Sequence, residues 1–309
     1  MKLLLVVNPS ASSVTPRARV IIEKALSGDH EVEVAETKRR GHATRLAQAA
    51  ATEGADVVAV LGGDGTLNEA ANGLAGTDTA LAPLPGGSTN VFARTIGLPD
   101  EPIDAAVATL DALANDNIRS VGLGSVNRRY FLFHTGIGFD AAVVEQVERR
   151  GDLKRYANHP LFAYAALTTW MRHYDRKQPR FSILYGDGSR IDDGYFSICL
   201  NTNPYTYLGG RPFDIAPEAT LDRGLVAVTI RSMKLIRFLP IIAGGLSSPQ
   251  RIKNSKYVDY RTDLDELEII GRAPFPYQVD GDFLGTVESL RLRHEPEVLR
   301  LVMPTAVTP

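Results

Sequence analysis

Cysteine is nearly missing from this sequence, which has only Cys199 among its 309 residues. One cysteine can form neither an intramolecular disulfide nor a cysteine zinc cluster, and such scarcity is typical of the reducing cytoplasm. An excess of either charge is missing too, because 34 Lys and Arg stand against 36 Asp and Glu, for a net charge of −2. Proteins that bind nucleic acids are more often basic, so we expect no nucleic-acid partner.

Long apolar runs are also absent. The longest apolar stretch of the C-terminal half, residues 235–246, contains Arg237, Pro240 and two glycines. It cannot span a bilayer, which takes about 20 apolar residues, although peripheral contact with a membrane stays open. The first nine residues resemble the start of a signal peptide but break at Asn8-Pro9 before an apolar core is complete, so a buried strand is favoured there. We therefore expect a cytoplasmic protein.

The first third of the chain alternates short apolar strands with helices, which predicts a parallel sheet covered by helices. Strands are expected at residues 3–7, 31–35, 56–61 and 80–83, and helices at residues 17–26, 43–52, 66–74 and 105–113.

The character of the chain changes near residue 125, and most later segments predict strands. These are expected at residues 120–123, 129–134, 181–185, 195–201, 225–230, 267–270, 278–279, 289–293 and 298–302. Two helical stretches interrupt them, at residues 139–149 and 160–175. This part is predicted to form an antiparallel sandwich or barrel with helices packed outside, in a chain long enough for two domains.

A glycine-rich turn follows the strand expected at residues 56–61 and carries an acidic group. Its sequence is Gly62-Gly63-Asp64-Gly65-Thr66. Glycine leaves backbone N–H groups open to a close ligand, and these groups form a natural anion site with the helix N-terminus behind them. An ordinary turn with Thr66 as the helix N-cap is the alternative, but three glycines exceed what a cap needs. We favour a phosphate site in which a metal or a phosphoryl acceptor separates Asp64 from the phosphate.

Two further loops are expected at the same edge of the sheet, because ligands of open parallel sheets collect at the carboxyl ends of the strands. Residues 8–13, Asn-Pro-Ser-Ala-Ser-Ser, follow the first strand, and residues 83–94 follow the fourth. The second of these loops presents two glycines and then Ser88 or Thr89 at an expected helix start. Arg94, on that helix, fits a solvent or salt-bridge residue as well as a ligand contact.

Two acidic turns in the second part of the chain each have two interpretations. Asp280-Gly281-Asp282 fits a hairpin turn, and it fits equally a general base with a second carboxylate beside it. Asp222 is explained by its turn alone, with a Mg²⁺ site of carboxylate and backbone carbonyls as the minority interpretation. The histidines show no metal-ligand spacing, and His42 lies in a basic loop that either is solvated or reaches a nucleotide.

Taken together, these motifs resemble the diacylglycerol kinase catalytic domain family, which includes bacterial soluble lipid kinases and the sphingosine and ceramide kinases. The matching residues are spread over nearly the whole chain in the family's order. They are Asn8-Pro9, Thr37 with Gly41-His42-Ala43, the run from Gly62 to Glu69, the run from Pro85 to Arg94, and Asp280-Gly281-Asp282. The aspartate-glycine turn alone also resembles NAD kinases and phosphofructokinases. Leu67-Asn68-Glu69 and the run from Thr89 to Arg94 are much more specific to the lipid kinases.

The resemblance implies a fold and a division of the chain. The N-terminal domain is a three-layer α/β domain, residues 1–125 joined by the C-terminal segment 295–309. Residues 126–294 form a β-sandwich domain for the lipid substrate, with ATP in the cleft between the two domains. The residues implied to line the nucleotide are Asn8, Pro9, Ser10, Ala11, Ser12, Thr37, Gly62, Gly63, Asp64, Gly65, Thr66, Leu67, Asn68, Glu69 and Ser88.

The same resemblance implies the chemistry. Asp282 matches the position of the proposed general base, which is usually Glu in the family, so the division of labour between Asp280 and Asp282 stays open. A structural Mg²⁺ is implied near Asp222. Asp64 is expected to organise the metal-bound ATP.

These observations predict an ATP-dependent lipid kinase, a transferase of phospholipid biosynthesis that converts diacylglycerol to phosphatidic acid at a membrane surface. After diacylglycerol, a sphingoid base or another lipid alcohol is the next candidate for the phosphoryl acceptor. An NAD kinase and a non-catalytic nucleotide or lipid sensor of the same fold are the alternatives. Residues 160–171 are the candidate apolar wall for the acyl chains, with an ordinary core helix as the alternative. The sequence leaves a homodimer open.

Overall fold

The computed structural model describes residues 1–149 and 159–305, whose contacts divide the chain into two compact units. Unit 1 consists of Met1–Leu123 together with the chain from Pro296, and unit 2 consists of Gly124–Glu295. Two strands, β5 (Ile118–Val126) and β16 (Asp282–Val302), pass from one unit into the other. The chain therefore crosses the boundary twice, and its last strand returns to the unit in which the chain began.

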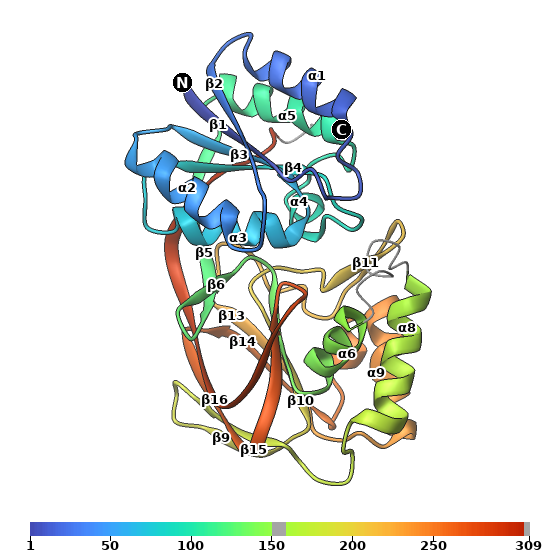
Figure 1. Ribbon diagram of the computed structural model, residues 1–309. Helices are drawn as coiled ribbons and strands as arrows, with labels where there is room; N and C mark the ends of the chain where they lie inside the picture. The colour runs from blue at the N-terminus through green and yellow to red at the C-terminus, as the bar shows by residue number, and fades with distance from the viewer. Residues whose placement is uncertain (150–158, 306–309) are drawn as a thin grey trace. The chain divides into compact units, whose positions relative to one another are not determined.

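Unit 1 is a parallel sheet with helices on both faces (Figure 1). The strand order is β2-β1-β3-β4, and the end of β16 adds a parallel neighbour to β4 by pairing Leu301 with Leu81. Figure 1 shows α1 and α5 on one face of this sheet and α2 and α3 on the other. The elements are β1 (Lys2–Val7), α1 (Pro16–Leu26), β2 (Glu31–Glu36), α2 (His42–Thr52), β3 (Val57–Gly62), α3 (Asp64–Leu74), β4 (Ala80–Pro85), α4 (Val91–Thr95) and α5 (Pro102–Ala114).

Residue type explains this layering. All six residues of β3 and all six of β4 are buried, as expected for central strands of a parallel sheet covered on both faces. Helix α1 begins after Thr15, whose hydroxyl accepts the N–H of Ala18 at 3.1 Å, and it has Pro16 at its first position. The core of the unit gathers strand residues such as Leu5 together with helix residues such as Ile22.

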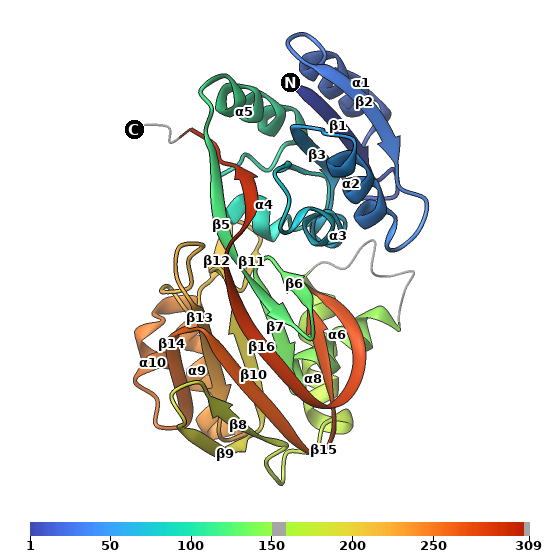
Figure 2. The same ribbon diagram turned by 90° about the vertical axis from the view of Figure 1, so that its left-hand side faces the viewer.

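Unit 2 is built from antiparallel strand pairs with helices beside them (Figure 2). Its main strand order is β14-β13-β10-β7-β15-β16; β5 pairs with β16, and β8 pairs with β15. The remaining elements are β6 (Arg129–Phe131), β7 (His134–Ile137), α6 (Phe139–Glu148), α8 (His159–Thr168), the π-helical turn η1 (Thr169–His173), β8 (Phe181–Tyr185), β9 (Arg190–Gly194), β10 (Phe196–Leu200), β11 (Thr206–Leu208), β12 (Arg211–Phe213), β13 (Leu225–Ile230), α9 (Leu235–Ser247), α10 (Gln250–Lys253), β14 (Val258–Leu264) and β15 (Glu266–Val279).

Two hydrophobic cores fill unit 2. One gathers side chains from the long strands, among them Phe181 and Phe275, whose ring centroids are 5.7 Å apart. The other joins strands β10 and β13 to helices α6 and α9, with Phe139, Phe196 and Phe238 in mutual ring contact. The inner face of α9 is therefore fixed to the sheet by aromatic packing.

The predicted fold class is confirmed, since an α/β unit is combined with a second unit of antiparallel strands. The expected helix start at Thr66 is wrong, because α3 begins at Asp64 with Gly63 as its N-cap residue. The expected start at Ser88 or Thr89 is also wrong, since α4 begins further along the chain.

Unit 2 departs from the expected segments mainly by breaking or merging them. The strand expected at residues 129–134 is broken into β6 and β7, because the backbone N–H groups at the break donate to Asp280. The short strands expected beyond residue 265 merge into β15 and β16, since bulges let the pairing continue past the prolines of β15. The apolar stretch at residues 235–246 lies in α9. Within residues 1–149 and 159–305, no helix is long and apolar enough to cross a membrane.

Candidate functional site

Three loops of unit 1 meet at the carboxyl ends of its strands. Because β1, β3 and β4 are parallel neighbours, the loops that follow them lie at one edge of the sheet. The Asn8 side chain donates to the Thr66 hydroxyl at 2.8 Å, and the Asn8 N–H donates to the Leu61 carbonyl at 2.9 Å. The Ser13 N–H donates to the Gly86 carbonyl at 2.8 Å. The structure thus brings together the loops that the sequence predicted at this edge.

Other residues expected to line the nucleotide lie in or beside the same loops. Thr37 follows β2, the parallel neighbour of β1, and donates its N–H to the Val7 carbonyl at 2.9 Å. Pro9, Ser10, Ser12 and Ser88 are exposed, and Ala11, Thr37 and Gly65 are partly exposed. Their polar and backbone groups are therefore accessible from solvent.

Two glycines are required by the close approach of two of these loops. A Cβ added to Gly87 would lie 2.8 Å from the Gly63 Cα, and one added to Gly86 would lie 2.9 Å from the Gly62 nitrogen. Such distances are well inside van der Waals contact, so a side chain at either position pushes the backbones apart. The glycines therefore bring the loop after β4 against the loop after β3.

A Gly87→Ala variant is expected to lose about 1–3 kcal/mol of unfolding free energy, because the added methyl group overpacks this contact. Urea unfolding measures this loss. Gly210→Ala is the control, because a Cβ added at Gly210 would meet nothing within 4 Å. Equal stability of the two variants would contradict the backbone contact between the loops.

Asp64 is partly exposed as a residue, but its carboxyl group packs inward and anchors α4. Its two oxygens accept the backbone N–H groups of Val91 and Phe92 at 2.9 and 3.1 Å. Burial raises the pKa of this carboxyl, while the two N–H groups act in the opposite sense. Because both oxygens face these donors, Asp64 fastens α4 to the glycine-rich turn. The role expected from the sequence, organising the metal-bound ATP, stays a prediction.

The Leu67-Asn68-Glu69 continuation also has structural roles. Leu67 and Asn68 are buried, so they offer little surface to a nucleotide. The Glu69 carboxylate accepts the N–H groups of Gly41 and Ala43, at 2.6 and 3.2 Å. Glu69 thereby fastens the start of α2 to α3, as a carboxylate at a helix N-terminus does favourably.

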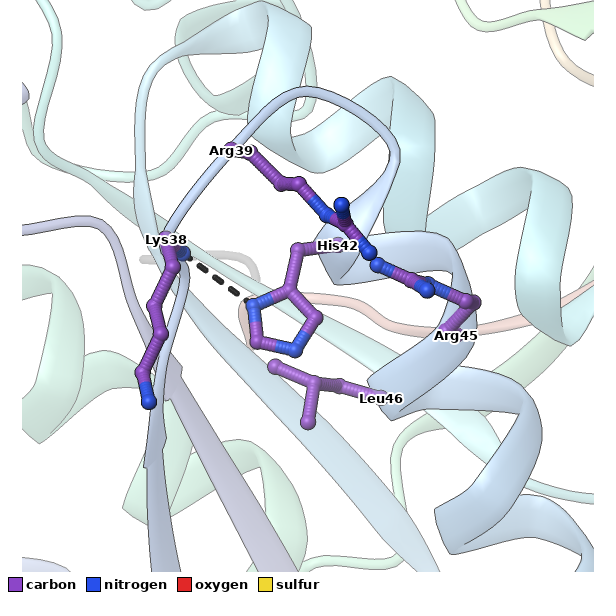
Figure 3. Close-up of a pocket in the computed structure, with 5 residues that line it drawn as sticks. All are labelled: Lys38, Arg39, His42, Arg45 and Leu46. Carbon is purple, nitrogen blue, oxygen red and sulfur yellow. Dashed lines mark hydrogen bonds between the residues drawn. The ribbon is translucent and has the colours of Figure 1, made fainter.

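The loop after β2 borders an open cavity of about 550 Å³ with cationic walls (Figure 3). Its lining residues are Lys38, Arg39, His42, Arg45 and Leu46. The side chains of Arg39 and Arg45 point toward each other in Figure 3. Guanidinium groups so placed favour an anion between them. His42 was singled out from the sequence, but Arg45 was not, although it lies one helical turn further along α2 and lines the same cavity.

In unit 2 the turn between β15 and β16 contains the two acids that the sequence could not tell apart. Asp280 is 5% exposed and has a left-handed backbone, with φ at 46°. Its carboxylate accepts the backbone N–H groups of Leu132, Phe133 and His134 at 2.7, 3.0 and 3.0 Å. Charge-assisted bonds from three backbone donors fix this carboxylate in place. Asp280 therefore holds the turn against the break between β6 and β7.

Asp282 is placed differently. Its side chain is 19% exposed, and its carboxylate lies 3.5 Å from the Arg129 guanidinium. The next residue, Phe283, donates its N–H to the Glu148 carboxylate at 3.2 Å, which ties the turn to α6. Asp282 thus combines solvent access with a cationic neighbour. Sequence reasoning missed Arg129, because one arginine in a short hairpin carries no distinguishing signal.

A buried polar network supports this turn from within unit 2. The Gly281 N–H donates to the Gln278 side-chain oxygen, and the Gln278 amide donates to Asp140, both at 2.8 Å. The Tyr205 hydroxyl donates to the other Asp140 oxygen. Burial raises the pKa of Asp140 and that of Tyr205, so the phenol keeps its proton. In the sequence, the one sign of this network is Gln278, a polar residue within a strand, and the structure shows that its side chain is fully buried.

The imidazole of His134 is buried beside this network. It contacts the rings of Phe133 and Tyr205, at centroid distances of 4.9 and 4.4 Å. Burial lowers the pKa of His134 to about 3. In an unfolded chain the pKa of a histidine is about 6.5. Between these values the unfolded state binds more protons, so falling pH destabilises the fold.

Between pH 7 and pH 5 the protein is expected to lose about 2 kcal/mol of unfolding free energy relative to a His134→Phe variant. The variant keeps an aromatic ring but cannot titrate. Buried carboxyls such as Asp140 have raised pKa values and act in the opposite sense, but they are present in both proteins and cancel in the difference. Urea unfolding at both pH values tests this, and a difference independent of pH would show that His134 is not held neutral.

The magnesium ion implied by the resemblance was expected near Asp222. Asp222 is exposed, and the N–H of the nearby Gly224 donates to the Asp263 carboxylate at 3.0 Å. Magnesium takes about six oxygen ligands, several of which are usually water. Over the part of the chain that the structure describes, no three His, Cys, Asp or Glu side chains gather as a metal site. That result concerns side chains, so a magnesium site made of Asp222 and backbone carbonyls stays a prediction.

Comparisons with known proteins agree on one family. The model of the diacylglycerol kinase catalytic domain matches residues 2–126. A probable YegS-like lipid kinase of Pseudomonas aeruginosa (strain UCBPP-PA14) is 30% identical over 314 residues, which cover 98% of this chain and 94% of the relative. The diacylglycerol kinase of Bacillus subtilis (strain 168) is 38% identical over 120 residues, 38% of this chain and 39% of that protein. A solved structure of a putative diacylglycerol kinase from Bacillus anthracis str. Sterne shares the fold, with a TM-score of 0.77, 24% identity, and coverage of 99% and 98%.

The parallel unit and the antiparallel unit give the chain the fold of that solved structure, and the named relatives place it among the lipid kinases. The match to a probable YegS-like lipid kinase covers 98% of the chain and identifies the family. The chain belongs to the diacylglycerol kinase catalytic domain family of lipid kinases. The resemblance first seen in the motifs is thereby confirmed.

Proposed function

We propose that the protein transfers the γ-phosphoryl group of ATP, supplied as its magnesium complex, to a hydroxyl of diacylglycerol, forming phosphatidic acid. Family membership supports a kinase acting on a lipid. The main structural support for the proposal is that the two carboxylates of the acidic turn have different surroundings. One carboxylate, Asp280, is locked by three backbone donors, and the other, Asp282, is partly exposed beside Arg129.

In this proposal Asp282 is the general base. It accepts the proton of the acceptor hydroxyl as that oxygen attacks the γ-phosphorus, and ADP leaves with the former bridging oxygen. Asp280 and the network through Gln278 keep the turn in place. Arg129 balances the charge of the base before transfer.

The loops of unit 1 are proposed to bind the nucleotide. Backbone N–H groups of the glycine-rich turns suit phosphate oxygens, and Asp64 holds α4 so that two of the loops keep their shape. The cationic cavity beside the loop after β2 adds positive charge to this unit. Catalysis then comes mostly from positioning and charge neutralisation, as is usual in phosphoryl transfer.

A kinase assay with parallel acceptors tests the proposal. The purified protein is incubated with ATP, Mg²⁺ and mixed micelles of diacylglycerol, and with sphingosine, ceramide or NAD in separate reactions. We expect labelled phosphatidic acid as the main product. Phosphorylation of NAD without any lipid would replace the proposal by an NAD kinase, and ATP binding without transfer to any acceptor would replace it by a sensor.

A further inference from the structure

Helix α9 presents an apolar face to solvent as well as to the core. Its inner face is buried through Phe238, Ile241 and two glycines. On its outer face Ile236 is 83% exposed, and four further leucine or isoleucine side chains are between 38% and 57% exposed. These are Leu235, Leu239, Ile242 and Leu246. Four of the five recur at helical spacing, i, i+4, i+7 and i+11, so they form one continuous row.

Positive charge surrounds this row. Residues 231–256 contain six cationic side chains and no acid, in a chain whose net charge is −2. The cations are Arg231, Lys234, Arg237, Arg251, Lys253 and Lys256. Arg231 and Lys253 form ion pairs with Asp193 and Glu218.

The two ends of α9 have the cations best placed for a partner. Lys234 is the N-cap residue of α9, and Arg251 lies in α10, which packs against α9 (Figure 2). Both side chains are exposed, and within residues 1–149 and 159–305 neither forms an ion pair. An apolar row with a cation at each end is the pattern of a helix that lies in a lipid–water interface.

We propose that the outer face of α9 binds the surface of an anionic bilayer. The apolar row enters the boundary between headgroups and acyl chains, and Lys234 and Arg251 contact anionic headgroups. A second copy of the chain fits this face less well, because a two-fold contact between two such surfaces brings their excess cations together. The inference rests on the proposed function, since only a water-insoluble acceptor requires the kinase to reach a bilayer.

Vesicle flotation without ATP tests the surface independently of catalysis. The protein is expected to bind phosphatidylglycerol-containing vesicles at least tenfold more tightly than phosphatidylcholine vesicles. Ile236→Gln with Leu239→Gln is expected to lower binding to both at least tenfold, because two apolar side chains no longer leave water. Lys234→Gln with Arg251→Gln is expected to lower binding to the anionic vesicles about tenfold and to leave neutral vesicles unaffected.

The matched control is Val20→Gln with Val107→Gln, which changes two exposed apolar helix residues of unit 1. It is expected to bind like the parent. Parental binding by the α9 variants, or a parental dimer that those variants abolish in sedimentation equilibrium, would overturn the proposal. The α9 variants should still phosphorylate a short-chain, water-soluble diacylglycerol. Vesicle binding by a parent that phosphorylates no lipid would overturn the proposed function but not the surface.

Discussion

An Asp282→Asn variant is expected to lose about a hundred- to ten-thousand-fold in kcat while folding as stably as the parent. The loss is the usual contribution of a positioned general base. Stability should change little, because the carboxylate is partly exposed and its ion pair with Arg129 spans 3.5 Å. Such a pair near the surface contributes about 1 kcal/mol at most, and the asparagine keeps a polar group of the same size for the other contacts. Initial rates with saturating ATP and diacylglycerol measure the first effect, and urea unfolding measures the second.

Two further variants sharpen this result. Asp282→Glu keeps a carboxylate and should retain far more activity than Asp282→Asn. Glu288→Gln removes an exposed acid from the same strand and should leave kcat unchanged. Turnover by Asp282→Asn above a tenth of the parental rate would remove the base assignment.

An Asp280→Asn variant is expected to lose about 2–4 kcal/mol of unfolding free energy, whereas Asp282→Asn is expected to keep the parental stability. The carboxylate accepts three backbone N–H groups. An amide replaces one accepting oxygen with a donor and removes the charge, which leaves at least one buried N–H unsatisfied. Activity should fall as well, because the turn that bears Asp282 loses its anchor.

The comparison between the two asparagine variants is the control, since both remove one negative charge from the same turn. Chemical denaturation of both under one condition is sufficient. Parental stability of Asp280→Asn would mean that its three backbone contacts do not hold the turn, and the two acids would then have to be reassigned.

The sequence predicts the parts of this fold that depend on local periodicity. The buried runs of β1, β3 and β4 are continuous and apolar, so they identify a parallel sheet and place the glycine-rich loops at one edge. The strands of unit 2 were harder to delimit. Bulges and prolines within β15 divide it in the sequence, whereas pairing with β16 continues across them.

The roles of the acidic residues could not be predicted from the sequence, because they depend on hydrogen-bond partners that are distant in the chain. Asp64 bonds to Val91 and Phe92, 27 and 28 residues away, and Asp280 bonds to residues nearly 150 positions earlier. A motif reveals that an acid is present in a glycine-rich turn. Only the tertiary fold reveals whether that acid faces a substrate or a backbone N–H.

The return of β16 to unit 1 has a consequence for how the protein can be divided. Besides the pairing of Leu301 with Leu81, the Gly76 N–H donates to the Val298 carbonyl, and the Arg300 side chain donates to the Asp78 carbonyl, both at 2.7 Å. A fragment that ends at residue 126, where the family match ends, would contain β4 without this neighbour. An uncovered apolar strand is a template for aggregation. Unit 1 is therefore separable only as a two-segment fusion that includes the end of the chain.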